Sequence, residues 1–266
     1  MPEPDDHLFA ADLAAEAGEL LLARREQLVA RGASAAELKA EGDRQSNELL
    51  MQRLAEGRPD DAILSEEGSG GSAGSGREGT GRLGADRVWI IDPLDGTREY
   101  SEPPRTDWAV HVALVRGGVP VAGAVALPAQ GLVLSSRPAA AMPPPPPARP
   151  RVIVSRTRPP AVAEHLAEAL GGELVAMGSA GAKAAAVVLG IADVYPHSGG
   201  QYEWDSCAPV AVAQAAGIHA SRLDGSPLAY NNADPYLPDL LVCHPAILDR
   251  VRAVLDTYLA AASDPS

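Results

Sequence analysis

Apolar residues in the N-terminal part of the chain recur at the spacing of amphipathic helices. In a helix expected over about 5–30, one apolar stripe carries Leu8, Phe9, Leu13, Leu20, Leu21 and Leu28. A second helix is expected over about 43–55. Asp43, near its start, suits a helix cap, and this role outweighs a catalytic one when that residue is considered alone.

Shorter apolar runs bounded by glycine and polar residues predict strands in the rest of the first half. The expected strands are 62–65, 88–91, 108–115, 119–127 and 132–135. Gly117 and Gly118 separate two of these runs and indicate a tight turn, which predicts an antiparallel hairpin. The first half is therefore expected to be an α+β unit.

Beyond residue 147, the pattern changes to alternating strands and helices. Strands are expected at 151–155, 174–177 and 192–195, and helices at 161–170, 180–189, 208–216 and 246–261. Such alternation is typical of an α/β layer. Five consecutive prolines at 143–147 are typical of a linker, so we predict two domains, 1–147 and 148–266.

Composition limits the kind of partner that the protein can bind. Of its 266 residues, 46% are hydrophobic but only 4% are aromatic, which predicts a core of Ala, Val and Leu. The net charge of −13 argues against binding a nucleic acid polymer or an anionic membrane, although a small nucleotide held through a metal is compatible with it. Two distant cysteines without metal-ligand spacing, and the absence of an apolar leader, indicate a reduced, cytoplasmic protein.

The candidate chemistry centres on the turn that follows the strand at 88–91. Asp92 and Asp95 flank Pro93 and precede Gly96, so the chain must turn where two carboxylates can point at one spot. Such hard oxygen ligands suit Mg²⁺, and the amides of Gly96 and Thr97 at an expected helix start could hold an anion. The sequence thus suggests a phosphatase, although acidic turns often only cap helices.

Further candidates lie on both sides of this turn. Glu66 precedes a glycine-rich stretch, and we expect residues 68–81 to form a mobile flap. Ser179 and Ala180 lie where a strand passes into a helix, a second possible anion contact, with Lys183 one turn later. A lysine in an Ala-rich helix more often reaches solvent. Elsewhere, Asp205 and Ser206 can act as helix caps and Cys207 as a packing residue, and His111 suits a core or edge residue better than a base.

Three motifs in order resemble those of the inositol monophosphatase superfamily, the Mg²⁺-dependent, lithium-sensitive phosphatases. They are Ser-Glu-Glu at 65–67, Trp-Ile-Ile-Asp-Pro-Leu-Asp-Gly-Thr at 89–97 and Trp-Asp-Ser-Cys-Ala-Pro at 204–209. The extension to Arg-Glu-Tyr at 98–100 and the Gly-Ser-Pro-Leu-Ala-Tyr-Asn of 225–231 look most like the CysQ-type 3′(2′),5′-bisphosphate nucleotidases. The resemblance implies a layered αβαβα sandwich with the active site between the halves.

The resemblance also implies roles for individual residues. The side-chain ligands of two or three Mg²⁺ ions would be Glu66, Asp92, Asp95 and Asp205, with the Leu94 carbonyl as a backbone ligand. Glu66, Thr97 and Asp43 would orient the attacking water and take its proton. Substrate would lie against Asp95, Gly96, Thr97, Ser179, Ala180, Lys183 and Asp205. One departure is the Lys-Ala-Glu-Gly-Asp of 39–43, which lacks the Pro-Val-Thr that family members usually carry before the second helix.

The expected activity is hydrolysis of the 3′-phosphate of adenosine 3′,5′-bisphosphate, and of its sulfated form, in sulfate assimilation. Inositol monophosphate and fructose 1,6-bisphosphate are alternative substrates, because the metal ligands do not distinguish them. The discriminating contacts are expected in the loop 197–203, with Gln201, Tyr202 and Glu203 as candidates, and around 222–230. A catalytically silent nucleotide sensor is the alternative from another class. Relatives are usually homodimers, so the resemblance implies a homodimer.

Overall fold

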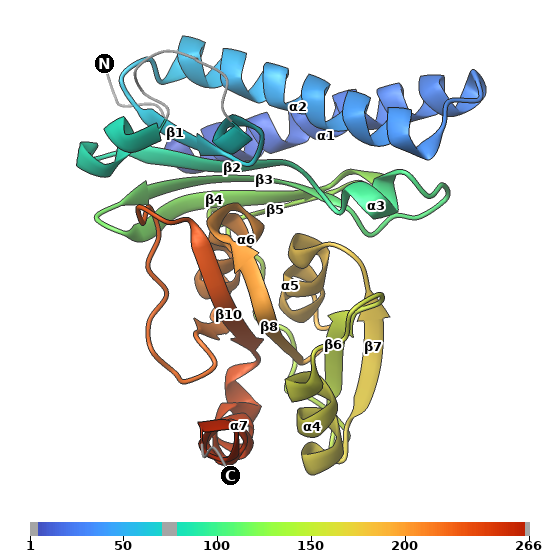
Figure 1. Cartoon of the computed structure of the whole chain (residues 1–266). Coiled ribbons are helices and arrows are strands. Elements are labelled where there is room, and N and C mark those ends of the chain that lie inside the picture. The colour runs from blue at the N-terminus through green and yellow to red at the C-terminus, as the bar shows by residue number, and fades with distance from the viewer. Residues whose placement is uncertain (1–4, 71–78, 264–266) are drawn as a thin grey trace.

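The computed structural model describes residues 5–70 and 79–263 in five layers. Residues 71–78, most of the expected flap, lie outside the described part. In Figure 1, two long helices cover a first sheet, two helices separate it from a second sheet, and two further helices cover the far side. The helices are α1 (Asp6–Ala30), α2 (Ala35–Gly57), α3 (Thr97–Tyr100), α4 (Ala161–Leu170), α5 (Ala180–Val188), α6 (Glu203–Ala215) and α7 (Leu248–Ser263).

The first sheet is mixed, with strand order β1-β2-β3-β4-β5. Only the pair β1–β2 is parallel, and the other neighbours are antiparallel. All eight residues of β2 are buried, because helices cover both faces of this sheet. Strands covered on both faces are typically continuous apolar runs, as residues 88–91 are. The strands are β1 (Ala62–Ser65), β2 (Val88–Asp95), β3 (Ala109–Arg116), β4 (Val119–Leu127) and β5 (Leu132–Ser135).

The second sheet has the order β7-β6-β8-β10-β9 and is also mixed. Strand β6 runs parallel to β7 and β8, while β10 is antiparallel to both of its neighbours. The expected loop 197–203 belongs mostly to β8, and the last two strands were not predicted. The strands are β6 (Arg151–Ser155), β7 (Glu173–Met177), β8 (Val194–Tyr202), β9 (His219–Ser221) and β10 (Tyr236–Cys243).

Two helices begin earlier than the apolar pattern indicates. Helix α2 starts eight residues before the expected position, because Ser34 and Glu37 form a capping box: Ser34 N–H donates to Glu37 Oε2 at 2.8 Å. Asp43 therefore lies inside this helix and is not its cap, contrary to the prediction. Helix α6 starts at Glu203, so Asp205 lies in its first turn, where its carboxylate accepts the N–H of Tyr202 at 2.6 Å.

Three apolar cores lie between the five layers. Along β2, Trp89 and Ile91 face the core under α1 and α2, while Val88 and Ile90 face the core shared with the middle helices. The latter core contains residues of both halves of the chain, because α5 and α6 pack against the first sheet although they follow the proline run. The third core lies between the second sheet, α4 and α7. The division into domains at residues 147/148 remains a prediction.

Candidate active site

Three carboxylates converge at the carboxyl end of β2. Asp92 and Asp95 belong to this strand, and Asp205 comes from the first turn of α6. One oxygen atom from each of the three lies within 4.8 Å of the others. The register with β3 shifts between Asp92 and Asp95, and the Leu94 N–H donates to Asp92 Oδ1 at 3.0 Å. The turn thus presents both of its acids to one point, where the three carboxylates could hold a metal ion.

Glu66 adds a fourth carboxylate from the end of β1, the strand parallel to β2. Although Glu66 as a residue is exposed, desolvation of its carboxyl group, followed by repulsion from Asp205 and Asp43, raises its pKa to about 7. Burial also raises the pKa of Asp92, and that of Asp205 to about 6. A cation among these groups would favour their ionised forms. We refer to Glu66, Asp92, Asp95 and Asp205 as the carboxylate cluster; its hard oxygen donors fit a hard divalent cation.

Asp95 differs from the rest of the cluster because donors surround it. Its carboxylate accepts the Ser179 hydroxyl at 2.5 Å and the N–H groups of Ala180 at 3.1 Å and Gly181 at 2.6 Å. Although burial opposes the shift, the nearby His111 lowers the pKa of Asp95 below its usual range. Within the cluster, Asp95 is therefore the acid whose environment favours the ionised form. Ser179 and Ala180, predicted to line the substrate side, also fix this acid.

His111 contacts the cluster from β3. Its Nδ1 lies 3.0 Å from the Trp204 carbonyl and its Nε2 lies 3.2 Å from Asp95 Oδ2. The second contact is an ion pair when the ring is protonated, and the charge of Asp95 favours that form by raising the pKa of His111 although burial opposes the shift. Gly181 makes room for the ring, because a Cβ there would overlap Nε2. The prediction of a buried residue is confirmed, but the contact with Asp95 was missed, because it depends on how β3 and α5 pack around β2.

Thr97 and Asp43 meet beside the Leu94 carbonyl. The Thr97 hydroxyl donates to Leu94 O at 3.1 Å, and the Asp43 carboxyl group lies near this side chain. Burial, and then the charge of Glu67, raise the pKa of Asp43 to about 7. Helix α2 can approach this closely because Gly42 has no side chain: a Cβ there would lie 2.8 Å from Leu94 Cδ2. The structure thus brings the predicted acid, Asp43, and the predicted hydroxyl, Thr97, together. The helix expected to begin at Gly96 and Thr97 is α3, which is only one turn long.

A cavity of about 560 Å³ opens beside the cluster. Its volume lies in the range of small-molecule sites. A larger hollow of about 720 Å³ on the outer face of α1 contains none of the predicted residues. All seven residues that were predicted to contact substrate line the smaller cavity: Asp95, Gly96, Thr97, Ser179, Ala180, Lys183 and Asp205.

Lys183 lines this cavity from inside the protein. The residue is 5% exposed, its Nζ donates to the Ser179 carbonyl at 2.5 Å, and it lies 5.2 Å from the centre of the Tyr195 ring. Burial lowers the pKa of Lys183, although the charge of Asp95 opposes the shift. The prediction that a lysine at this position more often reaches solvent is therefore wrong for Lys183.

The three candidates at the end of β8 have different environments. Gln201 and Tyr202 line the cavity. Glu203 is fully buried, and its carboxylate accepts the backbone N–H groups of Asn231 at 2.6 Å and Asn232 at 2.8 Å. Glu203 therefore holds a loop in place and does not face substrate, which corrects the prediction for this residue.

The segment 222–230 also serves the fold. The Arg222 guanidinium forms an ion pair with Asp239, with Nη2 2.7 Å from Oδ2, and the Tyr230 hydroxyl lies 3.2 Å from that of Ser206. Neither Arg222 nor Tyr230 is among the residues that line the cavity. The expectation that this segment discriminates between substrates is not supported by its position.

Comparison with known proteins agrees with the predicted family. The profile of the Inositol monophosphatase family matches residues 5–140 and 150–256. Two relatives are 3′-phosphoadenosine 5′-phosphate phosphatases: that of Mycobacterium bovis is 54% identical over 210 residues (76% of each chain), and that of Mycobacterium leprae is 50% identical over 272 residues (95% of each chain). The 2′AMP-bound structure of staphylococcal SaIMPase-II has a TM-score of 0.74, with 20% identity over 95% of each chain.

The likeness to the staphylococcal structure concerns the fold alone, and it confirms the layered sandwich that the motifs implied. The family match covers both sheets and every segment that contributes to the carboxylate cluster. Each predicted metal-ligand residue lies within the matched ranges. From these findings together, the chain belongs to the Inositol monophosphatase family.

Proposed function

We propose that this protein is a Mg²⁺-dependent phosphomonoesterase that hydrolyses the 3′-phosphate of adenosine 3′,5′-bisphosphate. The observation that carries the proposal is the convergence of Asp92, Asp95 and Asp205, the last two of which line a cavity with the volume of a small-molecule site. The names of the mycobacterial relatives supply the substrate class. The sulfated nucleotide is a second substrate in this proposal, and the role is in sulfur metabolism.

The residues can be divided between two cation positions. One position would be held by Glu66, Asp92 and the Leu94 carbonyl, and the other by Asp92, Asp95 and Asp205. Bound there, Mg²⁺ supplies the positive charge that a phosphate monoester needs before water can attack it, and it makes that water more acidic.

The remaining chemistry belongs to the side chains around these positions. Thr97 and Asp43 orient the attacking water, and its proton passes to Asp43, whose pKa burial raises to about 7, or to Glu66. Ser179 and the amides of α5 keep Asp95 ionised and fixed. The amides of Gly96 and Thr97 face the phosphate, and no covalent enzyme intermediate is required.

The substrate preference can be tested by measuring kcat/KM for adenosine 3′,5′-bisphosphate, inositol 1-phosphate and fructose 1,6-bisphosphate. We expect the nucleotide to lead by about a hundredfold or more, which corresponds to about 2.7 kcal/mol of transition-state preference. The nucleotide product should be adenosine 5′-phosphate, because the 3′-phosphate is the one removed. A lead for inositol or fructose phosphate would keep the chemistry and overturn the substrate. Nucleotide binding without phosphate release would indicate a sensor.

We further propose a cytoplasmic homodimer. Both cysteines, Cys207 and Cys243, are buried and free, which is compatible with a reducing compartment. Among the described helices, none combines the length and apolar character needed to cross a membrane. Light scattering of the purified protein at several concentrations tests the oligomeric state, with a mass of about 55 kDa (twice the 27.5 kDa of the chain) expected for the dimer.

A further inference from the structure

We propose that Gln201 and Tyr202 form a subsite that binds the purine base of a nucleotide and so set the preference of the cavity for nucleotides over inositol and sugar phosphates. Both residues line the cavity and lie at the end of β8, immediately before the helix that carries Asp205. This inference rests on the function proposed above. It adds the residues that would recognise the part of the substrate that does not react.

The Gln201 amide is the first observation. The residue is only 7% exposed, yet neither its Nε2 nor its Oε1 has a hydrogen-bond partner among the described residues. It is the only buried side chain in that part of the chain that leaves both a donor and an acceptor unpaired. A buried amide without partners is unfavourable, so its presence on the cavity wall indicates that another molecule completes its hydrogen bonds.

The second observation is an aromatic surface at the same place. The Tyr202 ring stacks on Trp204 with a centroid distance of 4.8 Å and an interplanar angle of 11°, yet Tyr202 remains 46% exposed. Tyr236 of the paired strand meets Tyr202 edge-on at 6.2 Å. Gly200 permits this arrangement, because a Cβ on Gly200 would overlap the Tyr236 ring. Tyr202 is thus a rigid, half-exposed aromatic ring.

The position of this ring is fixed relative to the carboxylate cluster. The Tyr202 N–H donates to Asp205 Oδ2 at 2.6 Å, so one end of the cavity wall is joined directly to a proposed metal ligand. A nucleotide whose phosphate lies at the cluster can therefore place its base against Gln201 and Tyr202, which line the same cavity.

The chemistry of these two side chains matches a purine. A glutamine amide can pair with the adjacent donor and acceptor on the edge of adenine. Any nucleobase can stack on an aromatic ring, because every base has a flat π-face. Inositol and fructose offer hydroxyl groups to an amide but no flat surface to Tyr202. The combination therefore favours a nucleotide.

The test uses three variants of the full-length protein, Tyr202→Ala, Tyr202→Phe and Gln201→Met. The main readout is the ratio of kcat/KM for adenosine 3′,5′-bisphosphate to kcat/KM for inositol 1-phosphate, and the second is the Kd of adenosine 5′-phosphate by calorimetry. Tyr258→Ala on α7 and Gln214→Met at the exposed end of α6 are matched controls that should keep the wild-type ratio.

We expect Tyr202→Ala to lower the ratio by about 10- to 100-fold, within the range of base–aromatic stacking, and Tyr202→Phe to stay within about threefold of wild type because it keeps the ring. Gln201→Met should lower the ratio by about tenfold and should not lower the melting temperature, because it removes an unpaired buried amide. Variants that lose both activities equally, or that keep the wild-type ratio, would overturn the subsite. A wild-type enzyme without nucleotide preference would instead overturn the substrate proposed above.

Discussion

Asp95 lies in the carboxylate cluster but has an environment of its own. Donors from Ser179 and the first turn of α5 surround it, while burial, followed by repulsion from neighbouring acids, raises the pKa of the other three. Ser179 has a positive φ of 54°, which is uncommon for a residue with a side chain. Its hydroxyl both accepts the Ala182 N–H at 2.9 Å and donates to Asp95. We infer that this local geometry fixes the orientation of Asp95.

The substitution Asp95→Asn should slow phosphate release by about a hundredfold or more, because it removes a negatively charged ligand whose lowered pKa keeps it ionised over a wide pH range. Adenosine 5′-phosphate should still bind, since the base and sugar side of the cavity is unchanged. Rates and Kd values measured on the same preparation check both statements. Asp249→Asn on the exposed start of α7 is the control. Unchanged turnover in Asp95→Asn would contradict the assignment.

The raised pKa values in the cluster predict how pH and Mg²⁺ act together. Asp43 and Glu66 have folded-state pKa values of about 7 and Asp205 of about 6, whereas such groups titrate near 4 in the unfolded chain. The folded state therefore holds more protons between about pH 4 and 7, so these groups stabilise the metal-free fold at low pH and this contribution is lost as pH rises through that window.

Because Mg²⁺ favours the ionised carboxylates, it should raise the melting temperature more at pH 8 than at pH 5. Thermal unfolding with Mg²⁺ or with chelator at the two pH values measures this difference. An increase that is equal at both pH values, or larger at pH 5, would show that these acids do not hold the cation.

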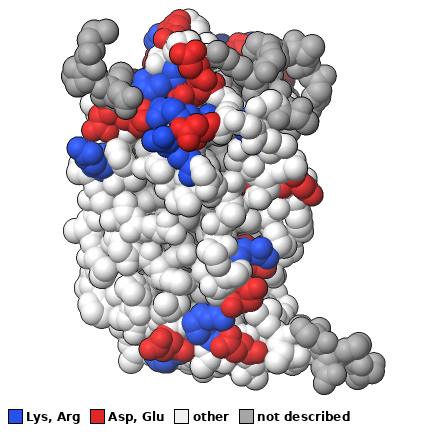
Figure 2. All heavy atoms as spheres, turned by 90° about the vertical axis from the view of Figure 1, so that its left-hand side faces the viewer, with Lys and Arg blue, Asp and Glu red and all other residues white. Residues whose placement is uncertain are grey.

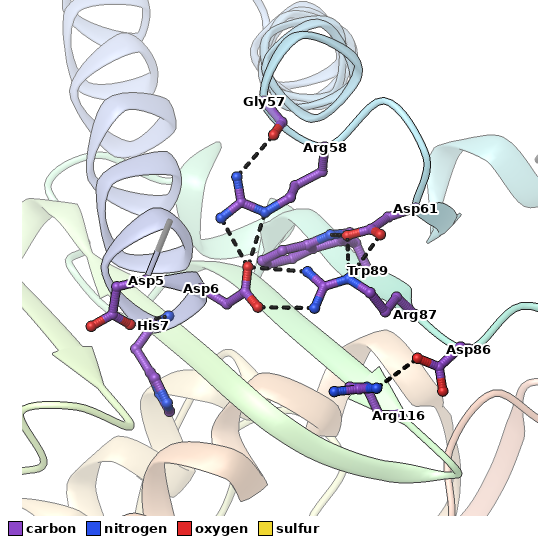
Figure 3. A network of polar contacts seen from close by, with 10 residues as sticks. All are labelled: Asp5, Asp6, His7, Gly57, Arg58, Asp61, Asp86, Arg87, Trp89 and Arg116. Carbon is purple, nitrogen blue, oxygen red and sulfur yellow. Dashed lines mark hydrogen bonds and ion pairs between the residues drawn. The ribbon is translucent and has the colours of Figure 1, made fainter. Parts of the chain in front are cut away.

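At the scale of elements, a network of charged residues joins three segments at the end of β2 that is remote from the cluster. Asp6 of α1 accepts Arg58 Nε at 2.9 Å and Arg87 Nη1 at 3.0 Å, and Arg87 Nε also contacts Asp61 Oδ1 at 2.8 Å. The Trp89 indole N–H donates to Asp61 Oδ2 at 2.8 Å. Figure 3 shows these contacts, and Figure 2 shows charges of both signs gathered at the end of the molecule that carries α1 and α2.

Replacing Asp6 by Ala should lower the free energy of unfolding by about 1–3 kcal/mol, because two partly buried guanidinium groups lose a charged hydrogen-bond partner. Asp86→Ala is the matched control: its ion pair with Arg116 is exposed, and we expect a change of about 0–1 kcal/mol. Denaturant unfolding measures both, and phosphate release should be unaffected in either variant. An equal effect of the two substitutions would show that the network does not stabilise the fold more than a surface pair does.

Sequence alone could predict those features of the fold and the site that depend on residues adjacent in the chain. The turn at Asp92 and Asp95 was predictable because Pro93 and Gly96 are adjacent to the acids. The contacts of His111 with Asp95 were not, because they depend on strand register and on the missing side chain of Gly181. Strands β9 and β10 were missed because their residues pair with distant segments and show no clear alternation.

At the scale of the whole molecule, the cluster depends on segments that are far apart in sequence. Glu66 and Asp92 come from neighbouring parallel strands of the first sheet, while Asp205 comes from a middle helix that follows the proline run. The core between the sheets contains residues of both halves, so the first sheet and the middle helices are packed as one body around the site. The family motifs could predict which residues converge. The close packing of α6 against β4 could be seen only in the structure, where a Cβ on Gly123 would lie 2.7 Å from that of Ala211.

The most direct test of the account is the initial rate of phosphate release from adenosine 3′,5′-bisphosphate, measured with added Mg²⁺ and with excess chelator. We predict rapid release with Mg²⁺, loss of at least 99% of that rate (about a hundredfold) in chelator, and recovery when Mg²⁺ is restored. A rate that chelator leaves unchanged, or no release under either condition, would contradict the claim that the carboxylate cluster is the metal site of a phosphatase.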